Sequence, residues 1–117
     1  MTPTEQHIKD VIDTYIPILM LQHFTFEINR DNDAYFTCKF CYPHFEAVIS
    51  YSDKAEKDFN EGKDLSRYVV HELCHLITDP LYSKAFDRFV SKNEIEDERK
   101  RLTDWITRIV MRLISGN

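Results

Sequence analysis

The segment His71-Glu72-Leu73-Cys74-His75 restricts the local structure of this chain more than any other feature of its sequence. Residues four positions apart share a face in an α-helix, so a helix would place the imidazoles of His71 and His75 one turn apart. The apolar neighbours then form a single stripe roughly opposite the two histidines: Val69, Val70, Leu73, Leu76 and Ile77. The sequence therefore predicts an amphipathic helix with one face for packing and the other available for binding.

The two histidines and the glutamate between them have the spacing that a catalytic zinc site requires. Neutral imidazoles of His71 and His75 would occupy two corners of a metal tetrahedron, and Glu72 would point toward a water activated by the metal. We expect one Zn2+ per chain and Glu72 as the catalytic base. The alternative is that His71 and His75 are surface histidines on a solvated helix face.

The length and charge of the chain limit the classes of function open to it. A chain of 117 residues predicts a single domain, 1–117, in which any cleft is built from the elements that also form the core. The net charge of -5 opposes binding to nucleic-acid phosphates. The start of the chain has no basic region and no long apolar run, and the odd number of cysteines fits reduced thiols. We therefore expect a cytoplasmic protein that binds neither nucleic acid nor membranes.

Hydrophobic periodicity predicts an α+β fold. A first helix should run from Pro3 to Leu19, with Thr2 as its N-cap and Glu5 completing a capping box. Apolar and polar residues then alternate in three segments, which should pair as one antiparallel sheet: 24–29, 35–40 and 45–51. The first two of these segments should form a hairpin through the turn 31–33.

Two further helices should follow the sheet. The helix with the histidines should begin after the N-cap Asp64, which follows the highly charged segment 52–63, and should end at Asp79-Pro80. Residues 81–92 are an ambiguous connection with some helical spacing. A long final helix should begin near the cap pair Asn93 and Glu96 and bury one stripe of apolar side chains: Ile95, Leu102, Trp105, Ile106, Ile109, Val110 and Leu113.

A catalytic zinc usually has three protein ligands, so a third ligand must come from elsewhere in the fold. The extended form of the motif is excluded, because Thr78 and Leu81 stand where its glycine and third histidine would be. Relative to the apolar stripe of the final helix, Glu98 points inward and Glu94 lies at the edge. We predict Glu98 as the third ligand and Glu94 as the second choice. Against this, acidic residues are common in an exposed first helical turn, where they favour the helix dipole.

These residues resemble a known family, the small zincin-type metallopeptidase domains often found as short phage or bacterial proteins. The resemblance rests on His71–His75, on the following residues 76–81 and on the acidic start of the final helix, 94–98. The expected order of elements, with an N-terminal helix, a three-stranded sheet, the motif helix and a long C-terminal helix, is also similar to a zincin core. The resemblance implies zinc-dependent hydrolysis of a peptide bond in a peptide or protein substrate. Similarity to the gluzincin branch implies a glutamate as third ligand, which corresponds to Glu98 or Glu94.

Two other interpretations use the same histidines. Cys38 and Cys41 form a Cys-x-x-Cys pair and, with His71 and His75, would complete a structural Cys2His2 zinc site. The long spacer and the strand alternation, which sends Cys38 inward and Cys41 outward, argue against it. The other interpretation is a structural or regulatory protein in which zinc only holds two helices together. Glu72 favours catalysis, because a structural site needs no carboxylate beside an open position. Four residues are candidates for an oxyanion donor, and the sequence does not select among them: Tyr82, Tyr68, His44 and Arg67.

Overall fold

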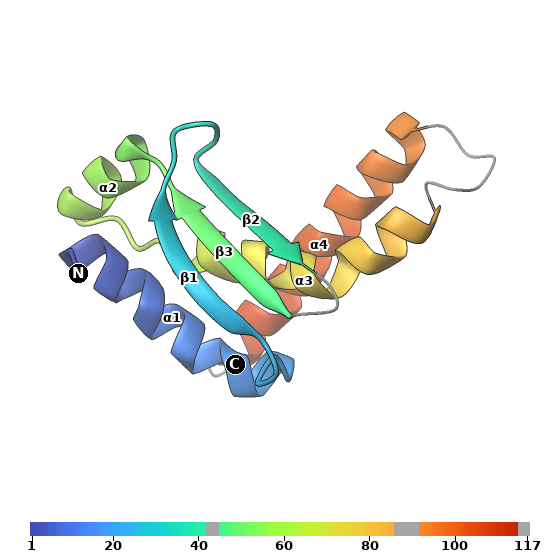
Figure 1. The fold of residues 1–117 in the computed structure, drawn as a ribbon, viewed down its shortest axis with the longest axis horizontal. Helices are drawn as coiled ribbons and strands as arrows, with labels where there is room; N and C mark the ends of the chain where they lie inside the picture. The colour runs from blue at the N-terminus through green and yellow to red at the C-terminus, as the bar shows by residue number, and fades with distance from the viewer. Residues whose placement is uncertain (42–44, 86–91, 115–117) are drawn as a thin grey trace.

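The computed structural model describes residues 1–41, 45–85 and 92–114 (Figure 1). The fold is α+β, as predicted. Its elements in chain order are α1 (Pro3–Leu19), β1 (Thr25–Arg30), β2 (Phe36–Cys41), β3 (Glu46–Tyr51), α2 (Asp53–Asn60), α3 (Ser66–Ala85) and α4 (Lys92–Ile114). Within these ranges, no helix is long and apolar enough to cross a membrane.

Helix α1 begins and ends at the predicted residues. The hydroxyl of Thr2 accepts a hydrogen bond from the N–H of Glu5 at 3.1 Å, and the Glu5 carboxylate accepts one from the N–H of Thr2 at 3.0 Å. The predicted capping box is therefore confirmed. At the other end Met20 adopts the left-handed conformation, with φ of 57°, and its N–H donates to the carbonyl of Ile16.

The sheet is mixed, with the strand order β1-β3-β2. Strand β3 pairs antiparallel with β2 and parallel with β1, so the prediction of an all-antiparallel sheet with a first hairpin through 31–33 is wrong. The burial of the strands accounts for the order. Residues 49–51 of β3 are all buried, whereas β1 has no fully buried residue. The central position suits the more buried strand, because both of its edges are paired there.

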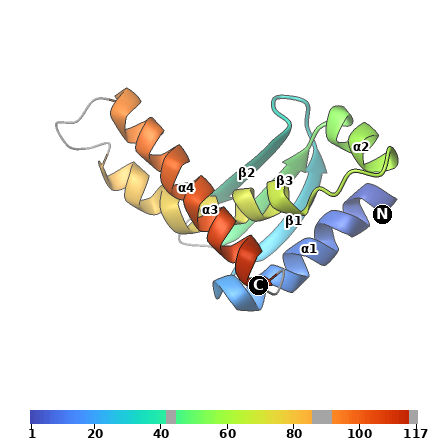
Figure 2. The same cartoon turned by 180° about the vertical axis from the view of Figure 1, so that it is seen from behind.

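One face of the sheet is covered by helices. Figures 1 and 2 show α1 and α3 lying against the same face, with α4 packed along α3. The side chains that point toward the helices are apolar and come from all three strands: Phe26, Ile28, Phe36, Cys38, Phe40, Ala47, Ile49 and Tyr51. On the other face Glu27, Val48 and Lys39 lie in one row across the strands. The alternation expected from the sequence is confirmed, including the inward position of Cys38.

The structure contains one helix that was not predicted and one helix that is longer than predicted. Helix α2 is an additional element, capped by Ser52, whose hydroxyl accepts the N–H of Ala55 at 3.1 Å. It is short and highly charged, and Ala55 is its only buried residue. Helix α3 does not end at Asp79-Pro80 but continues to Ala85, alongside α4. An interior proline removes one backbone hydrogen bond, a cost that packing against a neighbouring helix can offset. The rest of the predicted connection, 86–91, lies outside the described residues.

Helix α4 begins at Lys92, one residue before the predicted cap Asn93, and it buries a different face from the predicted one. Its buried residues are Ile95, Thr103, Thr107 and Val110, whereas Trp105, Ile109 and Leu113 are 56%, 50% and 72% exposed. The Oγ1 atoms of Thr78 and Thr103 lie 3.0 Å apart at the contact between α3 and α4. Small side chains on this line allow the two helices to approach closely, which large ones would prevent. Ile95 and Val110 belong to both faces, so the inward face is rotated from the predicted stripe by somewhat less than the roughly 100° of one residue, toward Thr103 and Thr107.

Candidate metal centre

The motif lies in the middle of α3, on the part of this helix that packs between β2 and α4 (Figures 1 and 2). The predicted apolar stripe is buried except for Ile77, which is 44% exposed: Val69, Val70, Leu73 and Leu76. This stripe anchors α3 against the core and leaves His71, Glu72 and His75 partly exposed along the other side. The predicted packing face is confirmed, and the opposite face is partly exposed and lies beside α4.

The structure brings the two imidazoles and the glutamate into one group. The Nε2 atoms of His71 and His75 lie 3.2 Å apart, and the two rings are nearly perpendicular, at 81°. A carboxylate oxygen of Glu72 completes a set of ligand atoms that all lie within 4.8 Å of one another. Two nitrogens bound to one tetrahedral zinc at about 2.0 to 2.1 Å would be about 3.3 Å apart. The separation of the imidazole nitrogens thus fits two corners of a zinc coordination tetrahedron.

Carboxylates hold the other nitrogen of each imidazole. The Nδ1 atom of His71 lies 3.0 Å from Asp104 on α4, and the Nδ1 atom of His75 lies 3.0 Å from Asp79. A carboxylate can only accept, so each neutral imidazole would donate from Nδ1 and carry its lone pair on Nε2. Two lone pairs then face each other at 3.2 Å. This is an unfavourable contact that a shared cation would convert into a favourable one.

Burial shifts the pKa values of two groups at the site. It lowers the pKa of His71, and the neighbouring His75 adds to this effect while Asp104 opposes it. A lower pKa favours the neutral imidazole that a metal binds. Burial also raises the pKa of Glu72 to about 7, with a further contribution from Asp79 and opposing contributions from His75 and Arg99. A carboxylate with a pKa near neutrality can both accept and return a proton.

Cys38 approaches the site from β2. Burial raises the pKa of its thiol to about 12, and the nearby carboxylates of Glu72 and Asp79 contribute to this rise. Among the described residues, Cys38 does not belong to the compact group formed by the two histidines and Glu72. The side chain of Cys41 lies outside what the structure describes. In the described part of the chain, Cys38 is therefore not placed with His71 and His75 as a Cys2His2 site would require.

The structure does not bring the predicted third ligand to the histidines. The Glu98 side chain is 67% exposed and accepts hydrogen bonds from Arg101 at 2.9 to 3.2 Å. Glu94 is also exposed. The prediction that Glu98 points inward is wrong because it rested on the stripe through Trp105 and Ile109, which faces solvent. In the described part of the chain, only Glu72 joins the two histidines as a potential ligand.

Sequence reasoning missed the two aspartates that hold the imidazoles. Asp79 lies four residues after His75, so the helical spacing that pairs the histidines also indicates this contact. Its other oxygen lies 3.8 Å from Arg99 on α4, which links the site to the neighbouring helix. Asp104 carries no such signal, because its position beside His71 depends on how α4 packs against α3.

The candidate oxyanion donors are placed only in part. Tyr68 is 48% exposed and lies one helical turn before Glu72, with its ring 6.0 Å from that of Phe36. The charge of Arg67 acts on His71 and contributes to the lowering of its pKa. His44 and the side chain of Tyr82 lie outside the described residues.

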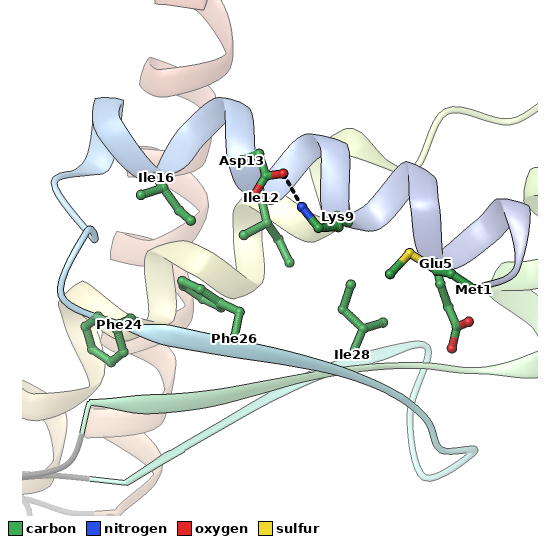
Figure 3. A pocket seen from close by; sticks show the side chains of 9 residues that line it. All are labelled: Met1, Glu5, Lys9, Ile12, Asp13, Ile16, Phe24, Phe26 and Ile28. Carbon is green, nitrogen blue, oxygen red and sulfur yellow. Dashed lines mark hydrogen bonds and ion pairs between the residues drawn. The ribbon is translucent and has the colours of Figure 1, made fainter.

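A separate cavity lies between α1 and β1, as Figure 3 shows, with a volume of about 560 Å³. Its walls are mostly apolar side chains: Met1, Ile12, Ile16, Phe24, Phe26 and Ile28. Its charged groups already have partners, since Lys9 pairs with Asp13 at 2.6 Å and Glu5 caps α1. This cavity does not contain the histidine group and offers no comparable set of reactive side chains.

Comparison with protein-family models, with curated proteins and with solved structures found no match to this chain.

Proposed function

We propose that the protein is a zinc-dependent peptidase with a minimal, zincin-like centre on α3. One observation carries the proposal: the Nε2 atoms of His71 and His75 face each other at 3.2 Å while both Nδ1 atoms are held by carboxylates at 3.0 Å. This arrangement presents two lone pairs toward one point, as a divalent metal with nitrogen ligands requires. His71 and His75 would hold the metal, and Glu72 lies beside them.

The roles of the residues follow from their positions. When bound, zinc would supply Lewis-acid chemistry, which activates water and polarises the carbonyl of the scissile bond. Glu72 takes the proton of the attacking water and returns it to the leaving amine, for which a pKa of about 7 is well suited. Asp104 and Asp79 keep the two imidazoles in the tautomer and orientation that direct Nε2 toward the metal.

The edge strand β2 gives a position for the substrate. Strand β2 contacts α3, and within the described sheet only one of its edges is paired, with β3. An extended peptide can add to a free strand edge through backbone hydrogen bonds, which bind it with little dependence on sequence. A peptide lying there would pass close to the motif helix. An unfolded or flexible segment fits this geometry better than a folded protein.

Metal analysis of three variants tests the proposal. We expect about one zinc per chain in the wild type and loss of most of it in His71→Ala and His75→Ala. Glu72→Gln should retain zinc and the fold but lose cleavage, because the amide cannot accept the proton. Cleavage is measured by mass spectrometry on unfolded proteins and a peptide library. Zinc retained in both histidine variants would exclude the site, and zinc-dependent products that do not differ between wild type and Glu72→Gln would exclude the mechanism.

Two further variants test the competing ligand sets. Cys38→Ser combined with Cys41→Ser should leave the zinc content unchanged, whereas a Cys2His2 site would lose its metal. Glu98→Ala should also retain zinc, because the carboxylate is bound by Arg101 in the structure. Weaker zinc binding in Glu98→Ala than in Glu96→Ala would instead support Glu98 as the third ligand.

A further inference from the structure

Two arginines extend the line of contact between α3 and α4 on which the metal centre lies. His71 on α3 contacts Asp104 on α4. Other contacts pair Thr78 with Thr103 and Asp79 with Arg99, so the two helices run antiparallel. One turn before His71 stands Arg67, and one turn after Asp104 stands Arg108. The charge of Arg67 acts on His71, and Arg108 lines a hollow together with Asp104, so each arginine lies beside one member of the His71–Asp104 pair.

These two positive charges have no carboxylate partner among the residues that the structure describes. Other arginines do: Arg30 pairs with Glu56 at 2.6 Å and Arg101 with Glu98 at 2.9 Å. Arg67 and Arg108 are both exposed, although the chain has 20 acidic against 15 basic residues. Two like charges beside the same His71–Asp104 pair repel each other, and an anion bound by both would offset this repulsion.

The surface beside Arg108 is hollowed. A cavity of about 290 Å³ is lined by Arg101, Asp104, Trp105 and Arg108. The Trp105 ring is 56% exposed, and the guanidinium of Arg101 lies 5.4 Å from its centroid. Asp104 is the acidic member of this lining, and its Oδ1 atom is held by His71 at 3.0 Å. The cavity is thus next to the histidine group, since Asp104 lines it and also contacts His71, and it offers Arg108 as a donor with no carboxylate partner among the described residues.

We propose that Arg67 and Arg108 form a subsite beside the metal centre that binds acidic side chains of a peptide substrate. This proposal deepens the proposed peptidase function and rests on it, because it takes the bound peptide to be the substrate. Glutamate and aspartate carboxylates fit because a guanidinium binds them through two parallel hydrogen bonds. The charge of the subsite is opposite to that of the chain as a whole, which selects for an acidic segment near the cleaved bond.

Peptide binding measured apart from cleavage tests this subsite. Fluorescent peptides of equal length, acetylated and amidated so that the chain ends carry no charge, would contain either glutamate or glutamine at the same positions. Their binding to the Glu72→Gln protein is followed by fluorescence anisotropy near physiological ionic strength. We expect the glutamate peptide to bind at least about tenfold more tightly than the glutamine peptide, as for a charge-assisted bidentate contact. Arg67→Ala combined with Arg108→Ala should remove this preference.

A matched control changes the net charge of the protein by the same amount at another place on its surface. Lys54→Ala combined with Lys57→Ala removes two exposed positive charges from α2 and should keep the preference for glutamate. Equal binding of the two peptides to the parent protein, or a preference that survives without Arg67 and Arg108, would overturn the assignment. Equally tight, arginine-dependent binding of a single-stranded oligonucleotide would also overturn it in favour of a general anion site. An arginine-dependent preference without any zinc-dependent cleavage supports the subsite and counts against the peptidase function alone.

Discussion

At the scale of single residues, the candidate site depends on two aspartates that hold the imidazoles and are not themselves proposed as metal ligands. Asp104 and Asp79 each lie 3.0 Å from an imidazole Nδ1. They set which nitrogen of each ring keeps its lone pair, and they limit rotation of the rings. The distance of 3.2 Å between the two Nε2 atoms is therefore a property of four side chains rather than two.

Asp104→Asn should weaken zinc binding by about 10-fold to 100-fold, because an amide holds the imidazole less strongly than a carboxylate does. Asp97→Asn is the matched control, since it makes the same change at an exposed position of α4 and should leave the affinity unchanged. The affinities are measured by competition with a chromophoric zinc chelator. Similar affinities for Asp104→Asn and Asp97→Asn would show that Asp104 does not position His71.

Glu72 should make the stability of the metal-free protein depend on pH. Its pKa is about 7 in the folded chain against 4.5 as the ordinary value, so between these limits the folded state holds a proton that the unfolded state releases. This contribution to stability is full below the lower pKa and is lost as the pH rises through the higher one. The substitution Glu72→Gln removes this pH-dependent loss of stability. The free energy of unfolding of the variant should therefore rise, relative to that of the wild type, by on the order of 2 to 3 kcal/mol between about pH 4.5 and about pH 8.

Urea unfolding of both proteins with a chelator present measures this difference. The lowered pKa of His71 acts in the opposite direction, adding stability as the pH rises, but it is present in both proteins and largely cancels. A difference between wild type and variant that stays constant over the whole range would show that Glu72 has an ordinary pKa in the folded chain.

At the scale of elements, the contact between α3 and α4 is set by small polar residues. The hydroxyl of Thr103 donates to the carbonyl of Arg99 at 2.7 Å and lies 3.0 Å from that of Thr78. Thr107 repeats the pattern one turn later, donating to the carbonyl of Thr103 at 2.7 Å. These threonines, which the sequence pattern did not select, determine which face of α4 is buried.

Thr103→Val should lower the free energy of unfolding by about 1 kcal/mol, because it keeps the shape but removes one buried hydrogen-bonding group. Thr14→Val is the control: its hydroxyl makes the same kind of bond, to the carbonyl of Asp10 at 2.8 Å, but on the exposed face of α1. Chemical denaturation compares the two. Equal losses in both variants would show that the bond along one helix, and not the contact between helices, accounts for the effect.

The elements that the sequence predicted best are those defined by local signals. The capping box at Thr2 and Glu5 located α1, and the alternation of apolar residues located the three strands. The order of the strands was not predictable in this way, because it depends on which strand gains most from the central position. Helix α2 was not predicted because it is short and highly charged and buries only Ala55.

At the scale of the whole molecule, one part of the site could be predicted from local spacing and the other part depends on how the elements pack. His71, Glu72 and His75 come from one helix, so their spacing alone predicted that they would meet. Asp104 and Cys38 approach the site from other elements, and only the packing of β2 and α4 against α3 places them there. The prediction that Glu98 points inward as the third ligand failed for this reason, because it inferred a contact between two helices from the apolar pattern of one helix.

A metal bound at this centre should stabilise the whole fold, because His71 and His75 are held together only in the folded chain. Free zinc at about 100 times its dissociation constant would add about 2.7 kcal/mol and raise the Tm by roughly 10 °C. Magnesium should have no comparable effect, since it prefers oxygen ligands. Thermal unfolding with zinc, with magnesium and with a chelator measures this, with His23→Ala as a control for zinc bound by an exposed histidine. The shift should persist in His23→Ala and disappear in His75→Ala; a shift of equal size in both would mean that zinc stabilises the protein from another place.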